Sequence, residues 1–259
     1  MILFIFEGKR EETVYQSMEA LFFGSLHEGE SIVRVYDGNI YDLYSTYVQY
    51  GGDMDIVSLL KDRFSKRGEE IFPKETKVSD FAEIYLFFDF DFHHSKRPIS
   101  ELCEQVSQML SVFDNETETG KLYISYPMIE ALRYTKQLPD ANFYTYTATR
   151  DQSKNFKSLA NTFSFYKNHS FITYNPEYPK ERLSEVKHNW VMLIEQNIEK
   201  ANWLCTGSKS LPANIEDVAP INLFAVQQRD YILPKEIVSV LSAFAMFLYD
   251  YFGRSIINE

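Results

Sequence analysis

Short apolar runs alternate with stretches of helical periodicity over the first half of the chain. The apolar runs have the length and continuous hydrophobicity of strands buried on both faces, and they lie at 1–6, 31–36, 83–88 and 121–125. Between them, apolar residues recur every three or four positions, which predicts helices at 9–22, 41–50, 54–64, 98–113 and from 127 onward. This alternation is typical of an α/β fold with a mainly parallel sheet flanked by helices.

The pattern changes after about residue 138. Helical spacing predominates from there and predicts helices at 156–166, 180–201 and 234–252. The stretch 142–149 is rich in Tyr and Thr and alternates like a strand. We therefore expect an α/β domain at 1–140 and a mostly helical region at 141–259, which packs on it and has no assigned role.

Acidic side chains outnumber basic ones, and this narrows the classes of protein to consider. The 259 residues carry a net charge of -11, which argues against a surface coated with basic groups for nonspecific nucleic-acid binding. A nuclease with screened acids and local basic residues remains compatible. Cys103 and Cys205 lie far apart without metal-ligand spacing, so we expect a reduced cytoplasmic protein with no disulfide, zinc finger or membrane association.

Two acids end the apolar run Tyr85–Phe88. Asp89 and Asp91 are separated by one residue, so in a strand their side chains point the same way. The carboxyl end of a parallel strand is where open α/β folds place their ligands. Two like charges held together need neutralising, and a hard divalent cation such as Mg²⁺ or Mn²⁺ suits carboxylate oxygens. A solvated loop after the strand is the alternative.

Two further acids follow the first predicted strand. Glu7 comes directly after it, and Gly8 is expected to supply the unusual backbone angles of a tight turn. Glu11 falls in the first turn of the next helix, where a negative charge also suits the helix dipole. Because they are four residues apart, Glu7 and Glu11 can both face the sheet edge that carries Asp89.

Three segments together resemble the Toprim domains of the RloB-like and OLD-type branch of phage-defence nucleases. Glu7-Gly8-Lys9-Arg10-Glu11 resembles the Glu-Gly-x-x-Glu opening, and Asp89-Phe90-Asp91 resembles the Asp-x-Asp motif. Ser125-Tyr126-Pro127-Met128-Ile129-Glu130 resembles the Asn/Ser-x-Pro-x-x-Glu segment. The resemblance covers about residues 1–135, and residues 140–259 match nothing comparable.

The resemblance implies a divalent-metal-dependent nuclease that cleaves DNA or RNA in bacterial defence against phages and plasmids. It implies catalytic roles for Glu7 and Asp89, and Mg²⁺ or Mn²⁺ ligands among Glu7, Glu11, Asp89, Asp91 and Glu130. OLD proteins also carry an ATPase domain. This chain has no G-x-x-x-x-G-K-[ST] motif, so any ATPase is expected to be a separate partner.

Other side chains have weaker claims to a role. The basic residues that flank the acids are candidates for phosphate or nucleic-acid binding. The alternative is that they are simply solvated. They are Lys9, Arg10, Lys96, Arg97 and Arg133. One of His93 and His94 could donate a proton or bind the metal. Tyr144 and Tyr146, beside Arg150 and Lys154, could stack single-stranded bases, although a surface loop explains them equally.

A different class of function competes with the nuclease. The acidic charge and the aromatic helical half also suit a non-catalytic regulatory or interaction subunit of a defence complex. The aromatic stripe within 244–252 most simply packs against the chain itself, and a partner or a second copy is the alternative. Convergence of the Glu7, Asp89 and Asp91 carboxylates in the folded protein is the observation that separates the two hypotheses.

Overall fold

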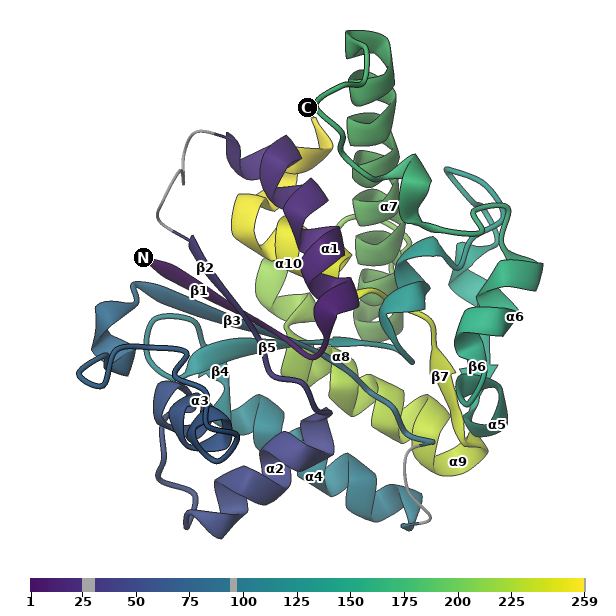
Figure 1. Ribbon diagram of the computed structural model, residues 1–259. Helices are drawn as coiled ribbons and strands as arrows, with labels where there is room; N and C mark the ends of the chain where they lie inside the picture. The colour runs from purple at the N-terminus through teal and green to yellow at the C-terminus, as the bar shows by residue number, and fades with distance from the viewer. Residues whose placement is uncertain (25–30, 94–96, 259) are drawn as a thin grey trace.

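A five-stranded sheet forms the centre of the molecule. The computed structural model describes residues 1–24, 31–93 and 97–258 (Figure 1). The strand order is β2-β1-β3-β5-β4. The strands are β1 (Ile2–Phe6), β2 (Ser31–Val35), β3 (Glu83–Asp89), β4 (Asp114–Asn115) and β5 (Gly120–Ser125). All neighbours pair in parallel except β4, which forms a short antiparallel pair with β5. The predicted α/β class and mainly parallel sheet are confirmed.

The order of the strands makes the carboxyl edge between β1 and β3 a topological switch point, and we call this edge the β1–β3 crevice. From β1 the chain passes to β2 on one side, and it then returns to β3 on the other side of β1. Connections that leave in opposite directions from neighbouring strands open a gap at their carboxyl ends, and open α/β sheets bind ligands there. In this chain the residues at that point are Glu7 and Asp89.

Helices cover both faces of the sheet, and side-chain alternation along the strands divides the core into two layers. On one face, Phe4, Phe6 and Phe87 pack against α1 (Lys9–Met18) and α10 (Ala243–Phe252). The opposite face is covered by α2 (Ile40–Gln49), α3 (Ile56–Ser65) and α4 (Ile99–Val112) (Figure 1).

The second half of the chain completes the core of the first half. The Phe247 ring of α10 packs edge-on against Phe4 and Phe87, with centroids 5.8 and 5.3 Å apart. The long helix α7 (Lys180–Thr206) packs in turn on α10. Buried residues from both halves belong to one hydrophobic cluster. The predicted division at residue 140 therefore marks a change of pattern along the chain, while the core continues across it.

Several elements differ from their predicted form. The segment expected to be one helix at 234–252 contains α9 (Leu233–Lys235), β7 (Ile237–Ser239) and α10. β7 pairs with β6 (Thr147–Thr149), so cross-strand pairing overrides the helical spacing. The helix expected from Pro127 is a short 3-10 helix, η4 (Ile129–Arg133).

The remaining helices of the second half are mostly short. They are α5 (Arg150–Ser153), α6 (Phe156–Phe163) and α8 (Pro220–Val226), and α8 continues into the π-helical turn η8 (Gln227–Ile232). A second π-helical turn, η1 (Glu19–Phe23), follows α1 in the first half. In η8, buried Gln227 exchanges two hydrogen bonds with the backbone of Ser239. Among the helices described, none is long and apolar enough to cross a membrane.

Candidate functional site

Glu7 and Asp89 meet at the crevice between β1 and β3. Phe6 pairs with Phe87 in the parallel register, which brings the residues that follow each strand to the same sheet edge. The Glu7 Oε2 atom accepts a hydrogen bond from the Asp89 backbone N–H at 2.9 Å, across 82 positions of sequence. Asp89 is 8% exposed. The two acids that the sequence predicted separately therefore lie side by side.

Glu11 joins the same edge from the first turn of α1. It is buried, and its Oε2 accepts the Gly8 N–H at 3.1 Å, so the carboxylate satisfies a free amide at the start of the helix. The Gly8 backbone is extended, with φ of -144°, so the prediction of unusual backbone angles at this glycine is wrong. Space explains the glycine better, because a Cβ at this position would lie 3.2 Å from Glu11 Oε2.

Asp91 lies in the segment that follows β3, and several distant groups hold that segment. Its φ of +43° is in the left-handed region, which Asp tolerates better than most residues. Its N–H donates to the Pro127 carbonyl at 3.2 Å. The Tyr41 hydroxyl donates to the Phe90 carbonyl at 2.7 Å, and Arg150 Nε donates to the Phe92 carbonyl at 2.9 Å.

Glu130 approaches the acids from η4 and is 1% exposed. Its Oε1 accepts a hydrogen bond from Arg10 Nη1, while its Oε2 is buried without a hydrogen-bond partner among the described residues. The charge of Glu130 raises the pKa of Glu11, which shows that the two side chains are close. In this arrangement Glu130 is neutralised by an arginine.

Burial and mutual repulsion raise the pKa values of three of the acids. Burial is the main cause for Glu7, whose pKa is raised to about 9, with Asp91, Glu11 and Asp42 adding repulsion. The pKa of the buried Asp89 rises for the same reasons, with Glu7, Glu11 and Asp91 as the charged neighbours. The pKa of Glu11 is raised to about 7. The cluster therefore holds protons near neutral pH when no cation is bound.

The predicted basic residues divide into three groups. Lys9 and Arg10 are exposed beside the acids, and Arg97 is exposed and pairs with Glu101 at 3.2 Å. Arg133 does not face solvent, because it is 3% exposed and its guanidinium donates to the Tyr166 carbonyl and Asn161 Oδ1. We interpret Arg133 as a structural residue here. Lys96 and His94 lie outside the described residues.

His93 lies near Asp91, and His169 lies near Arg10. His93 Nδ1 is 3.8 Å from Asp91 Oδ1. Beside Arg10, a cavity of about 110 Å³ is lined by Ser17, His169 and Trp190 among others. Burial and the charges of Arg133 and Arg10 lower the pKa of His169 to about 4, so this imidazole is neutral.

Sequence reasoning missed three residues that act on the site: Tyr41, Asp42 and Arg150. They lie on elements whose position over the sheet edge depends on tertiary packing. In the sequence, Arg150 stands out only as a basic residue near Tyr144 and Tyr146.

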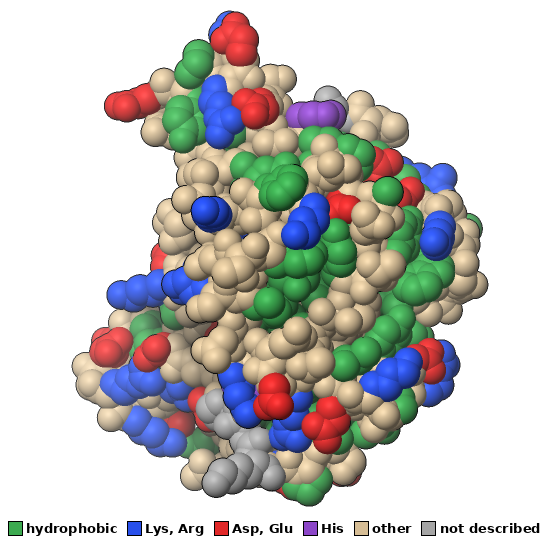
Figure 2. Space-filling model, turned by 90° about the vertical axis from the view of Figure 1, so that its right-hand side faces the viewer, with side chains coloured by type: hydrophobic (Ala, Val, Ile, Leu, Met, Phe, Trp, Pro, Cys, Tyr) green, Lys and Arg blue, Asp and Glu red, His purple; other side chains and the backbone are tan. Residues whose placement is uncertain are grey.

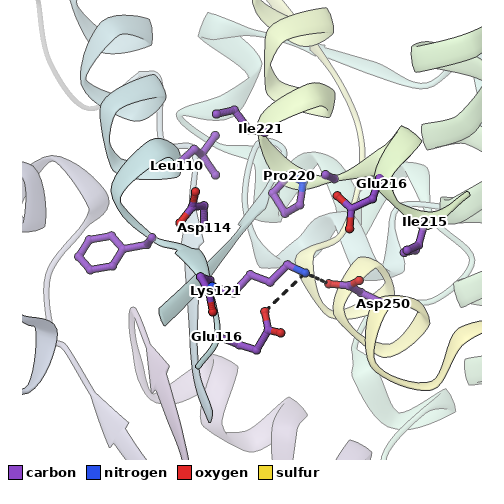
Figure 3. A pocket seen from close by; sticks show the side chains of 12 residues that line it. Leu110, Asp114, Glu116, Lys121, Ile215, Glu216, Pro220, Ile221 and Asp250 are labelled. Atoms are coloured by element: carbon purple, nitrogen blue, oxygen red, sulfur yellow. Dashed lines mark ion pairs between the residues drawn. The ribbon is translucent and has the colours of Figure 1, made fainter. Parts of the chain in front are cut away.

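A cavity of about 310 Å³ lies at the opposite end of the strands. It is bordered by Asp114, Glu116 and Asp250, and Lys121 at the start of β5 points toward the latter two (Figure 3). Lys121 Nζ is 2.5 Å from Asp250 and 3.8 Å from Glu116. Lys121, which lines this cavity, is therefore already paired with acids. The cavity also lies far from the crevice at the carboxyl ends of β1 and β3.

The carboxylates of the cluster are the right ligand type for a hard divalent cation, although their side chains do not converge on one point in this structure. Over residues 1–24, 31–93 and 97–258, no group of three or more His, Cys, Asp or Glu is arranged to hold a metal ion. Glu7 and Glu11 accept from backbone amides, and Glu130 is held by Arg10. Carboxylate oxygens are the ligands that Mg²⁺ and Mn²⁺ prefer, and a cation would replace the protons that now limit repulsion.

Comparison with family models, curated proteins and solved structures finds no match for this chain.

Proposed function

We propose that this chain is a divalent-metal-dependent nuclease with a Toprim-like site, which hydrolyses phosphodiester bonds of DNA or RNA. One observation carries the proposal. Acids that three separate segments supply gather at the β1–β3 crevice and raise one another's pKa values. Such a concentration of buried acids is costly for stability, and groups with strongly perturbed pKa values are frequent at functional sites.

Each acid has a proposed role. Glu7, Asp89 and Asp91 would hold Mg²⁺ or Mn²⁺, with Glu11 supporting them and Glu130 available after release from Arg10. The ion would supply charge stabilisation at the phosphoryl oxygens and acidify bound water. Without the ion, Glu7 and Asp89 hold protons at their carboxyl oxygens because burial raises their pKa values, and the ion would displace these protons. Exposed Arg10 and Lys9 would orient the phosphate groups.

Cleavage assays test this function directly. The purified chain is incubated with plasmid, tRNA and single-stranded oligonucleotides in Mg²⁺ or Mn²⁺. Glu7→Gln and Asp89→Asn should each reduce cleavage by about a hundredfold or more, because a metal ligand is lost. Glu12→Gln is the matched control, since this helix acid is absent from the repulsive interactions of the cluster. Unchanged cleavage in Glu7→Gln and Asp89→Asn would contradict the assignment.

The proposed biological setting is bacterial defence against phages or plasmids, with any ATPase supplied by a partner, and it rests on the resemblance of the three motifs alone. Expression of the chain, with neighbouring genes where they encode an ATPase, should lower phage plating efficiency. The Glu7→Gln variant should restore plating at equal protein levels. Protection that survives Glu7→Gln would separate defence from the acid cluster.

A non-catalytic interaction subunit is the second candidate. The observation in its favour is that Glu7, Glu11 and Glu130 already have protein partners and form no ready metal cage. It predicts no thermal stabilisation by Mn²⁺ and a stable complex on affinity purification. The nuclease proposal predicts stabilisation by Mn²⁺ that is lost in Asp89→Asn.

A further inference from the structure

One surface segment differs in charge from the rest of the molecule. Residues 152–176 contain no Asp or Glu, although the whole chain has 37 acidic residues and a net charge of -11. We call this stretch the acid-free segment. It carries Lys154, Lys157 and Lys167, all exposed, and Lys154 pairs with the neighbouring Asp151 at 2.7 Å. An anionic partner would be repelled by most of the protein and accepted here.

Exposed aromatic surface accompanies these lysines. Phe165 is 72% exposed, and the Lys136 ammonium lies 5.9 Å from the centre of its ring. Figure 2 shows the side of the molecule that carries α5 and α6, where hydrophobic side chains gather near the middle with Lys and Arg side chains around them. An exposed ring beside cations can stack a nucleobase while the lysines contact phosphates.

The acid-free segment is physically joined to the acid cluster. Arg133 follows Glu130 on η4, and its guanidinium donates to the carbonyls of Lys157 and Tyr166. The Ser164 hydroxyl donates to the Arg133 carbonyl at 2.6 Å. The other connection is Arg150, just before the segment, which donates to the Phe92 carbonyl after Asp91. The acid-free segment therefore packs beside η4 and beside the residues after β3, which carry Glu130 and Asp91.

We infer that the acid-free segment is the docking surface for a single-stranded nucleic acid. Lys154, Lys157 and Lys167 contact the phosphates, and Phe165 stacks a base. The inference rests on the proposed nuclease function, since it names the form of the substrate and the surface that binds it. Single strands are favoured over duplexes because an exposed ring can stack only on an unpaired base.

Binding measured without cleavage tests this surface. Fluorescence anisotropy of labelled oligo(dT) and oligo(U) is recorded in EDTA over a range of salt concentrations. The Lys154→Glu/Lys157→Glu/Lys167→Glu variant should bind about tenfold or more weakly. Its plot of log affinity against log salt should lose about two units of slope, since each phosphate contact on a single strand contributes about 0.7.

Two further variants separate local contacts from overall charge. Lys66→Glu/Lys74→Glu/Lys77→Glu makes the same charge change on exposed residues that follow α3, at the other side of the molecule (Figure 1). It should weaken binding by less than about threefold. Phe165→Ala should weaken binding about fivefold or more without changing the salt slope, because stacking releases no counterions.

Several results would overturn the inference. The first is that single strands do not bind, and the second is that the two triple-lysine variants lose affinity equally. The third is tighter binding of duplexes than of single strands. The fourth is binding of anionic phosphatidylserine vesicles in place of oligonucleotides. Because EDTA removes divalent ions, binding is scored separately from catalysis. Loss of cleavage with intact binding would reject the nuclease alone, and loss of segment-dependent binding with intact cleavage would reject the docking surface alone.

Discussion

The contribution of Glu7 to the stability of the folded state depends on pH, and it is favourable at low pH and unfavourable at high pH. Its pKa is raised from 4.5 to about 9 mainly by burial, so the folded state binds this proton more tightly than the unfolded chain does. The stabilising contribution is therefore complete below the unfolded value and is lost as pH rises through about 9. A neutral amide at this position would not titrate.

We therefore expect Glu7→Gln to flatten the dependence of stability on pH. At about pH 9 the variant should melt several degrees above the wild type, since 1 kcal/mol corresponds to roughly 2–4 °C for a chain of this size. Near pH 5 the two should differ little. Thermal melts across this pH range in EDTA measure the effect, and parallel curves for the two proteins would contradict it.

The Arg10–Glu130 pair is asymmetric, because Glu130 is buried while the Arg10 side chain is 46% exposed. Arg10→Gln leaves a buried carboxylate without its cation and should lower the free energy of unfolding by about 1–3 kcal/mol. Glu130→Gln leaves only an exposed arginine and should cost less. Urea denaturation of both variants checks the order, and a larger loss in Glu130→Gln would contradict this interpretation.

At the level of elements, the segment after β3 is positioned by other parts of the fold. Tyr41 of α2 holds the Phe90 carbonyl, and Arg150 of α5 holds those of Phe92 and Arg97. Both groups fix the backbone on either side of Asp91. Arg150 is therefore a positioning residue from the second half of the chain.

Loss of Arg150 should weaken metal binding without removing any ligand. We expect Arg150→Gln to lower Mn²⁺ affinity about tenfold, which is typical for groups that orient a ligand. Exposed Ser158→Ala in the neighbouring helix α6 is the control. Isothermal titration gives both affinities, and an unchanged value in Arg150→Gln would show that the segment after β3 keeps its form without this contact.

Sequence reasoning identified the sheet because buried parallel strands are continuous apolar runs bounded by turn residues. It placed Glu7 and Asp89 at one edge because parallel strands end together. It missed β7, which is three residues long and paired with β6 across 90 positions of sequence. It also missed Tyr41, Arg150 and the burial of Arg133, because their partners are backbone carbonyls far along the chain that carry no signal in the local pattern.

For the whole molecule, the two halves of the chain share one core. α10 lies against the same face of the sheet as α1, and Phe247 touches three strands through Phe4, Phe87 and Tyr123. A region of separate function would not need such contacts. The helical half is thus part of the scaffold that fixes the crevice.

Phe247→Ala should destabilise the entire chain. The buried ring leaves a cavity in the centre of the core, and we expect a loss of about 3–5 kcal/mol in the free energy of unfolding. Exposed Phe165→Ala is the matched control and should change stability little. Both are measured by urea denaturation with far-UV circular dichroism, and separate transitions for the two halves would contradict a shared core.

Binding of Mn²⁺ by the acid cluster is the central claim, and isothermal titration at about pH 8 tests it most directly. The wild type should bind Mn²⁺ and release protons, seen as a heat that depends on the ionisation enthalpy of the buffer, because the ion displaces protons held by Glu7 and Asp89. Asp89→Asn should abolish binding, and Glu12→Gln should preserve it. No binding by the wild type, or equal binding by Asp89→Asn, would contradict the account.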